Sequence, residues 1–290
     1  MNIVAHILNF SLMIAMPIGL AVYLVRKIKT EWYLFGIGMA TFILSQVFHI
    51  PFNQWVLNPL VINLGLNLDQ KGAQLVIISI LYGLSAGLFE EIARYLGYRF
   101  WVKRDRNWKS ALMYGAGHGG IESILLGFLV LVSFIQAISL RGVDLATVVD
   151  ADQVELVRAQ IDAYWSTPWH LAILGAVERL ATICFHLSAT VLVLQAFRRK
   201  NITWLALAIF WHTLVDAVAV FASRTWNPYI TEGIILVFGI LSLGVIYLLK
   251  SPSDPVDEGS FILKPDVELP QLEIQSVMPS EENLEDSRYA

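Results

Sequence analysis

The sequence predicts an all-α membrane protein: a bundle of seven transmembrane helices, or eight if one further apolar segment also crosses the bilayer. Hydrophobic residues make up 56% of the chain and charged residues only 15%, whereas about a quarter of the residues in a soluble domain are charged. Seven stretches are apolar over roughly the 20 residues that a spanning helix needs. Basic residues gather in alternate connections between these stretches. Together these observations indicate a polytopic membrane helical bundle.

The predicted spanning helices follow one another along the first 250 residues. In order, they cover residues 3–25, 32–50, 73–101, 110–137, 169–197, 203–221 and 230–249. At about 1.5 Å per residue, each is long enough to cross a hydrocarbon core about 30 Å thick. The first stretch has neither a basic segment before it nor a clear small-residue cleavage site after it. We therefore expect it to remain as an anchor helix.

The basic residues predict the orientation, because Lys and Arg accumulate in cytoplasmic connections. They follow the first, third, fifth and seventh predicted helices as Arg26, Lys27 and Lys29, then Lys103, Arg104, Arg106 and Lys109, then Arg198, Arg199 and Lys200, and finally Lys250. These four places lie at one end of the predicted bundle, which we call the basic end. The N-terminus is therefore predicted outside and the C-terminus in the cytoplasm.

Two connections at the other end are long enough to carry structure. Residues 51–72 are apolar but interrupted by Pro51, Pro59 and several Asn residues. We expect an interfacial or re-entrant segment there, or an eighth span. Residues 150–165 mix acidic with apolar side chains, which is typical of an amphipathic surface helix acting as a lid or spacer.

The last forty residues differ in composition from the rest of the chain. Residues 251–290 contain ten acidic residues against Lys264 and Arg288, which gives a charge of −8, and five of the ten prolines. This composition predicts a disordered cytoplasmic tail beyond a membrane domain at residues 1–250. Nothing in the sequence is typical of nucleic-acid recognition. The single cysteine, Cys184, excludes an intrachain disulfide.

Titratable side chains interrupt four of the apolar stretches at a similar depth. They are Glu90, Glu91, His118, Glu122, His186, His212 and Asp216. Counting residues from each basic flank places the first groups on each helix roughly 14–20 Å from the basic end. An ionisable group in hydrocarbon is costly unless it is paired or wetted, so such a set predicts a functional site.

The spacing within each helix repeats. Glu90 precedes Arg94 by four residues, and the same interval separates His118 from Glu122 and His212 from Asp216. Residues four apart share one helical face, so each helix can direct two groups into a common cavity. Several glycines surround His118, and they predict close approach of a neighbouring helix. The pair formed by Glu178 and Arg179 is interpreted as a structural ion pair nearer the outer face.

These residue types suit hydrolysis. Hydrolysis requires an activated water, a base that takes its proton and an acid for the leaving group. Glu90 and Glu91 are candidate bases, and Arg94 would orient one of them. The three histidines with a carboxylate could instead bind a divalent metal, typically zinc, with one position left for water.

Four short motifs carry a family resemblance. They are EEIAR from Glu90 to Arg94, HGGIE from His118 to Glu122, ER…FH from Glu178 to His186, and HTLVD from His212 to Asp216. With these motifs in this order, residues 1–250 resemble the bacterial YhfC family, which is described as membrane peptidases. More distantly, the chain is similar to the CAAX-processing and bacteriocin-processing peptidases and to the PrsW proteases.

One motif departs from the pattern of the distant families. Their first motif is EExxxR, whereas this chain has EExxR, which turns Arg94 by about 100° relative to the acids. Their aromatic-xxx-His motif is matched from Tyr114 to His118, and their HxxxN/D motif from His212 onward. The resemblance implies peptide hydrolysis in or beside the membrane, with a glutamate activating water and the two histidines forming an oxyanion or metal site.

The resulting hypothesis is a peptidase of the bacterial inner membrane, with a water-filled cavity reached from the cytoplasmic side. The expected catalytic residues are Glu90, Glu91, Arg94, His118 and His212. The expected ligands of a divalent metal, zinc by preference, are His118, Glu122, His186, His212 and Asp216. The expected partners are membrane lipids and a substrate that is a membrane-anchored peptide or small membrane protein.

Two other classes of function would use the same polar cluster. In a proton-coupled transporter the groups would form a relay, although the broken half-helices and repeats of transporters are not visible in the sequence. In a scaffold or immunity protein without catalysis they would only bond the helices to one another. Retained turnover in both Glu90→Gln and Glu91→Gln would exclude the peptidase assignment.

Overall fold

The computed structural model describes residues 2–250, and the elements in this range are all helical. Seven of them are long and apolar enough to cross a membrane: Asn2–Ile28, Trp32–Asn63, Ala73–Phe100, Trp108–Ser139, Trp169–Arg198, Thr203–Thr225 and Pro228–Leu248. These helices match the seven predicted stretches, so the prediction of a polytopic membrane helical bundle is confirmed. The predicted tail, residues 251–290, lies outside the described residues.

The first two spans each contain a π-helical segment. Their elements are α1 (Asn2–Tyr23), η1 (Leu24–Ile28), α2 (Trp32–Phe52), η2 (Asn53–Leu57) and α3 (Asn58–Asn63). Pro51 lies inside α2, and the helical path continues through η2 into α3. Residues 51–63 therefore lengthen the second span, and the part of the chain that the structure describes holds no eighth one.

The remaining elements complete the bundle. They are α4 (Ala73–Phe100), α5 (Trp108–Ser139), the short 3-10 helix η3 (Leu145–Thr147), α6 (Val154–Ser166), α7 (Trp169–Ala172), α8 (Leu174–Arg198), α9 (Thr203–Thr225) and α10 (Pro228–Leu248). Asparagine side chains cap two of these helices, because Asn107 accepts from Ser110 N at 2.9 Å and Asn227 accepts from Ile230 N at 3.1 Å. The predicted surface helix is present as α6, which has no buried residue.

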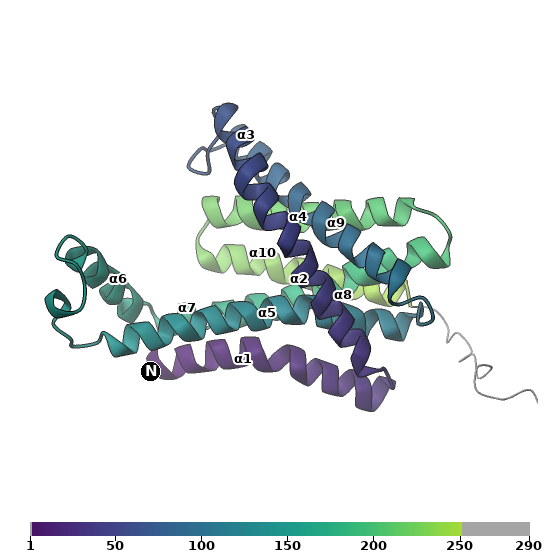
Figure 1. The fold of residues 1–290 in the computed structure, drawn as a ribbon, viewed down its shortest axis with the longest axis horizontal. Helices are drawn as coiled ribbons and strands as arrows, with labels where there is room; N and C mark the ends of the chain where they lie inside the picture. Colours follow the sequence, from purple (N-terminus) through teal and green to yellow (C-terminus); the bar gives the residue numbers. More distant parts are fainter. Residues whose placement is uncertain (1, 251–290) are drawn as a thin grey trace, which may run out of the picture. The chain divides into compact units, whose positions relative to one another are not determined.

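Helix α5 packs against α1, α2 and α8, whereas α4 packs along α9, and α8 also contacts α10 (Figure 1). Two glycines allow α8 and α9 to approach their neighbours closely beside the site histidines. A Cβ added at Gly119 of α5 would lie 2.6 Å from Cδ2 of His186, and one added at Gly87 of α4 would lie 2.9 Å from the carbonyl oxygen of Ile209. The absent side chains therefore let α8 and α9 bring their histidines against α5 and α4.

The apolar core lies between the polar level and the basic end. Its fully buried members include Leu34, Tyr98, Met113, Tyr114 and Leu194. Many large apolar side chains elsewhere on the long helices are exposed, as expected where a bundle faces lipid rather than water. The polar groups predicted from sequence lie just beyond this core.

Candidate functional site

The structure brings all of the predicted site residues into one cluster. Helix α4 supplies Glu90, Glu91 and Arg94, α5 supplies His118 and Glu122, α8 supplies His186, and α9 supplies His212 and Asp216. Six of these residues are buried, and Glu91, Arg94 and His118 are completely so. Each member contacts at least one other member by an ion pair or hydrogen bond. The cluster therefore connects four helices at one level.

Glu91 binds two positively charged or proton-bearing partners at once. Its Oε1 accepts from Nη1 of Arg94 and from Nδ1 of His212, the latter at 2.6 Å. Its side chain is fully buried. Glu91 is thus occupied in holding an arginine on its own helix and a histidine on α9.

Glu90 points to a different set of partners. Its Oε2 lies 3.1 Å from Nε2 of His118 and 3.6 Å from Nη2 of Arg94, and Oε1 accepts from Gln46 Nε2 at 3.2 Å. The same Oε2 lies 3.9 Å from Nε2 of His212. Glu90 therefore lies where side chains from α2, α4, α5 and α9 meet. Successive helix positions point about 100° apart, which explains why the two glutamates have different surroundings.

His118 is oriented by a hydroxyl on α2. Thr41 Oγ1 donates to the carbonyl oxygen of Gly38 at 2.9 Å and lies 3.1 Å from Nδ1 of His118. Because its proton is given to Gly38, the Thr41 oxygen can accept from the Nδ1–H of the imidazole. With that tautomer, Nε2 directs a lone pair at Glu90. The lone pairs of Nε2 and of Glu90 Oε2 then face each other across 3.1 Å, and they repel unless a proton or a metal cation lies between the two atoms.

His186 has a partner on each ring nitrogen. Arg94 Nη2 donates to Nδ1 at 2.6 Å, so the imidazole proton belongs on Nε2, which donates to Glu122 Oε2 at 2.6 Å. Glu122 also accepts from Nη1 of Arg179 at 2.5 Å, and Arg179 in turn pairs with Glu178. The predicted pairing of Glu178 with Arg179 is therefore present, and it belongs to the same network as the site.

His212 lies among three carboxylates. Nδ1 contacts Glu91, whereas Nε2 lies 3.3 Å from Oδ2 of Asp216 and 3.9 Å from Oε2 of Glu90. A hydrogen bond from one imidazole nitrogen to a buried carboxylate fixes the ring and leaves the other nitrogen to face the site. His212 is thus positioned by Glu91 and faces Glu90 and Asp216.

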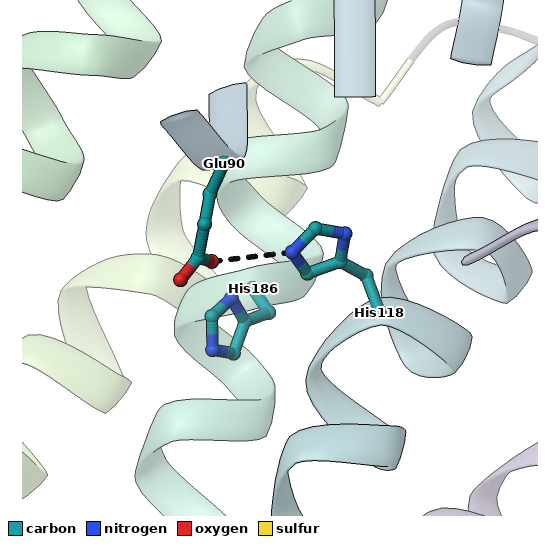
Figure 2. A group of neighbouring side chains, drawn as sticks. All are labelled: Glu90, His118 and His186. Carbon is teal, nitrogen blue, oxygen red and sulfur yellow. Dashed lines mark hydrogen bonds and ion pairs between the residues drawn. The ribbon is translucent and has the colours of Figure 1, made fainter. Parts of the chain in front are cut away.

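Three side chains from different helices form a possible metal-binding group. Glu90, His118 and His186 each offer a donor atom, and these atoms all lie within 4.8 Å of one another (Figure 2). Two imidazoles and a carboxylate form a donor set that is typical of zinc. The further bonds of His118 to Thr41 and of His186 to Glu122 are those expected around ligating histidines. The residues present therefore fit a divalent metal.

The grouping differs in composition from the predicted ligand set. Of the five expected ligands, His118 and His186 belong to the group, and Glu90, expected as a base, is its third member. His212, Glu122 and Asp216 are engaged instead with neighbouring ionic partners.

The cluster carries more negative than positive charge. Together with the adjoining pair of Glu178 and Arg179, it has five carboxylates, and among the described residues these pair with two guanidiniums, those of Arg94 and Arg179. With neutral imidazoles, the formal charge is −3. Inside a membrane such an excess has to be balanced by protons, by water or by a bound cation.

Two polar residues of α2 belong to the site without having been predicted. Thr41 contacts His118, and Gln46 donates to Glu90. A signal for Thr41 exists in the sequence, because Thr41, Ser45 and His49 recur every four residues in an otherwise apolar span. A search for polar side chains without a formal charge would have found this face.

A separate cavity of about 690 Å³ lies between α2 and α4. Its wall is mostly apolar and includes the polar side chains of Thr41, Ser45 and Ser85. None of the ionisable cluster residues contributes to it. The cavity is therefore distinct from the ionisable cluster. Thr41 connects the two, because it lines the cavity and also contacts His118.

The fold and the cluster together define a multi-pass membrane protein with a buried carboxylate, imidazole and guanidinium site. Residues 12–236 match the model of the YhfC intramembrane metalloprotease family, so the chain belongs to that family. It is similar to the "Uncharacterized membrane protein YhfC" of Bacillus subtilis, with 31% identity over 240 residues that cover 81% of this chain and 91% of the relative. No solved structure is significantly similar to it. The likeness to CAAX-processing, bacteriocin-processing and PrsW proteases remains one of motifs alone.

Proposed function

We propose that this protein hydrolyses peptide bonds of membrane-anchored peptides or small membrane proteins. The observation that carries the proposal is the convergence of Glu90, His118 and His186 within 4.8 Å, at the polar level of seven membrane-spanning helices. Membership of a family described as intramembrane metalloproteases supports the same activity. The bacterial inner membrane is the expected location.

In this proposal Glu90 is the general base where water is activated without a metal, and it is a ligand instead where a metal is bound. Its neighbour Glu91 is occupied by Arg94 and His212, whereas Glu90 has only longer contacts of 3.1 to 3.9 Å with imidazole and guanidinium groups. A base needs such freedom to take a proton from water and pass it on. Arg94 and His212, held by Glu91, are the cationic or hydrogen-bonding groups that face the developing oxyanion.

Glu90, His118 and His186 would hold the metal, zinc by donor chemistry. A bound zinc ion lowers the energy of forming hydroxide from water and polarises a carbonyl group. Thr41 and Glu122 keep the two imidazoles oriented through their second nitrogens. Glu122 is itself fixed by Arg179, so the orientation of His186 depends on a pair of residues at the outer side of the cluster.

A second candidate function is a bundle locked without metal, and one contact favours it. Arg94 Nη2 faces both His186 Nδ1, at 2.6 Å, and Glu90 Oε2, at 3.6 Å, so a permanent cation already faces two of the three donors. A scaffold without catalysis would keep this arrangement. The two functions differ in whether metal replaces the guanidinium at these donors.

Metal content distinguishes them. The purified chain is expected to carry about one zinc per molecule by mass spectrometry, and His118→Ala should lose it. His170→Ala is the matched control, because His170 is outside the cluster and bonds only to Tyr229 among the described side chains. Absence of any divalent metal from the wild-type chain, after purification without chelators, would favour the locked bundle.

Peptide hydrolysis is tested by the termini it creates. Membranes that contain the wild-type chain should show new N-termini of membrane proteins, and these should disappear in Glu90→Gln. Termini that persist in Glu90→Gln would remove Glu90 from the role of base. A transporter would instead give pH-dependent flux in vesicles and no new termini.

A further inference from the structure

The bundle is packed very differently on the two sides of the polar cluster. Toward the basic end, the residues from Phe185 to Ala196 on α8 are all buried, and so are those from Ser110 to Ile121 on α5. On the other side of the cluster, from Glu122 on α5 and from Cys184 on α8, half-buried and exposed residues alternate with buried ones. Helices α5 and α8 are therefore tightly enclosed in the basic half, where the cavity between α2 and α4 has a mostly apolar wall, and they are only partly enclosed in the opposite half.

An aromatic floor closes the basic side of the site. It consists of Tyr98, Tyr114 and Phe197, with ring centroids 4.9 Å apart for the two tyrosines and 5.7 Å apart for Tyr98 and Phe197. Both tyrosines are completely buried. Tyr114 Oη donates to the carbonyl oxygen of Arg94 at 3.1 Å, and the guanidinium of Arg106 lies 4.3 Å from the Phe197 ring centre. The floor thus lies directly between the cluster and the basic connections.

The opposite side of the cluster presents charged groups that are not buried. The side chains of Glu122, Glu178 and Asp216 are 24%, 32% and 34% exposed, whereas Glu90 is 8% exposed and Glu91 is fully buried. An exposed carboxylate at this depth is stable only where water reaches it. We call the partly exposed side of the cluster that carries these three carboxylates the vestibule.

The geometry points to a single aqueous entrance to the site, through the vestibule and from the end opposite the basic loops. The inference rests on the proposed function in one respect, since the water that enters is the reagent of the hydrolysis. It differs from the expectation of access from the cytoplasmic side, because the aromatic floor belongs to a packed apolar core on that side and the cavity beside it has a mostly apolar wall. With the basic loops in the cytoplasm, the vestibule faces the exterior.

The entrance also restricts the substrate. A peptide segment reaches Glu90 only past the carboxylates of the vestibule, of which Glu122 and Glu178 share the single guanidinium of Arg179. Like charges opposed in this way disfavour an acidic segment. The substrate class is therefore a membrane-anchored polypeptide whose scissile segment lies on the outer side and is poor in acidic residues.

The accessibility of single cysteines tests the entrance. Cys184 is the only cysteine of the chain, so Cys184→Ser gives a clean background. Thr182 and Thr190 lie four residues before and four residues after His186, on one face of α8, and Thr190 is completely buried. A cationic, membrane-impermeant methanethiosulfonate should modify Thr182→Cys in right-side-out membrane vesicles and leave Thr190→Cys unmodified, as measured by intact-protein mass.

Two control variants identify which side of the membrane the reagent reaches, and a second pair of positions guards against a variant that fails to fold. Asp152→Cys should react in right-side-out vesicles and Lys103→Cys only in inverted ones. A second matched pair on α9, Val220→Cys and Ala208→Cys, should repeat the contrast, since Ala208 is fully buried. If a variant of one pair fails to fold, the other pair gives the answer.

The outcomes that overturn the inference are distinct from a failure of the proposed function. Modification of Thr182→Cys only in inverted vesicles, or in neither preparation while Asp152→Cys reacts, would refute an outer entrance. Modification of Thr190→Cys from the basic side would refute the closed floor. Because thiol labelling does not require hydrolysis, the same pattern in a Glu90→Gln background supports the entrance even for an inactive chain.

Discussion

At the scale of single residues, the surroundings of Glu90 and Glu91 separate two roles that their adjacency hides. Glu91 Oε1 receives both Arg94 and His212, and its carboxylate is fully buried. Removing one partner of a buried pair leaves the others uncompensated, which costs far more than an exposed pair is worth. Under the proposed function Glu91 is therefore a residue of stability and positioning, whereas Glu90, with longer contacts, is the one that takes part in the chemistry.

Neutralising each glutamate should give opposite phenotypes. Glu91→Gln is expected to lower the free energy of unfolding by about 3 kcal/mol, because Arg94 and His212 lose their common counter-charge. Glu90→Gln should change it much less while abolishing cleavage. Denaturant unfolding in mixed micelles measures the first effect and the appearance of new termini the second. Equal destabilisation by the two substitutions would contradict the separation of roles.

The hydroxyl of Thr41 should matter through His118. Thr41→Val keeps the shape of the side chain and removes the acceptor for Nδ1, so the affinity for zinc is expected to fall about 10- to 100-fold, the usual cost of losing a hydrogen bond to a ligating histidine. Thr41→Ser, which keeps the hydroxyl, should bind nearly as the wild type does. Competition with a chelator of known affinity measures both. Equal affinity of the Val and Ser variants would show that Thr41 does not orient the ligand.

The charged and imidazole residues of the site could be predicted from the sequence, because ionisable groups are conspicuous in apolar spans. Their partners could not. Which of two adjacent glutamates faces Arg94 and His212 depends on the rotation of α4 about its axis, and that rotation is set by packing against α9. Thr41 and Gln46 were missed because uncharged polar side chains are ordinary in membrane helices.

At the scale of the helices, the two glycines of α2 differ in their role, because only Gly38 lies at the contact with α5. A Cβ at Gly38 would lie 2.2 Å from the carbonyl oxygen of Tyr114, whereas one at Gly36 would meet nothing within 4 Å. Gly38→Ala should therefore cost about 1–3 kcal/mol of stability through overpacking. Gly36→Ala, two residues away on the same helix, should stay within about 0.5 kcal/mol. Similar unfolding of the two variants would argue against a close α2–α5 contact.

The positions of the helices were predictable to within a few residues at most ends, because length and hydropathy determine a membrane span. The second span was not, since Pro51 and Pro59 suggested that it ended early. In the structure Pro51 lies inside α2, Pro59 follows the π-helical segment η2 directly, and the helical path continues through both. Sequence alone does not reveal such continuity because a proline can either end or bend a helix.

At the scale of the whole molecule, the orientation in the membrane remains a prediction from the basic connections. A fluorescent protein fused after Ala290 is expected to be bright, as it folds in the cytoplasm, and an alkaline phosphatase fused at Asp152 is expected to be active outside. The physical basis is the retention of Lys and Arg on the cytoplasmic side. Reversed signals from the two reporters would invert the molecule and, with it, the side on which the vestibule opens.

The guanidinium of Arg94 has a consequence for the order of assembly. It contacts His186 and lies near Glu90 within the bundle itself, so the polar groups have a cation from the moment the helices associate. Structural zinc domains, by contrast, wait for their metal before they fold. The bundle can thus assemble as an apoprotein, and under the proposed function the later loading with metal would be a step of activation rather than of folding.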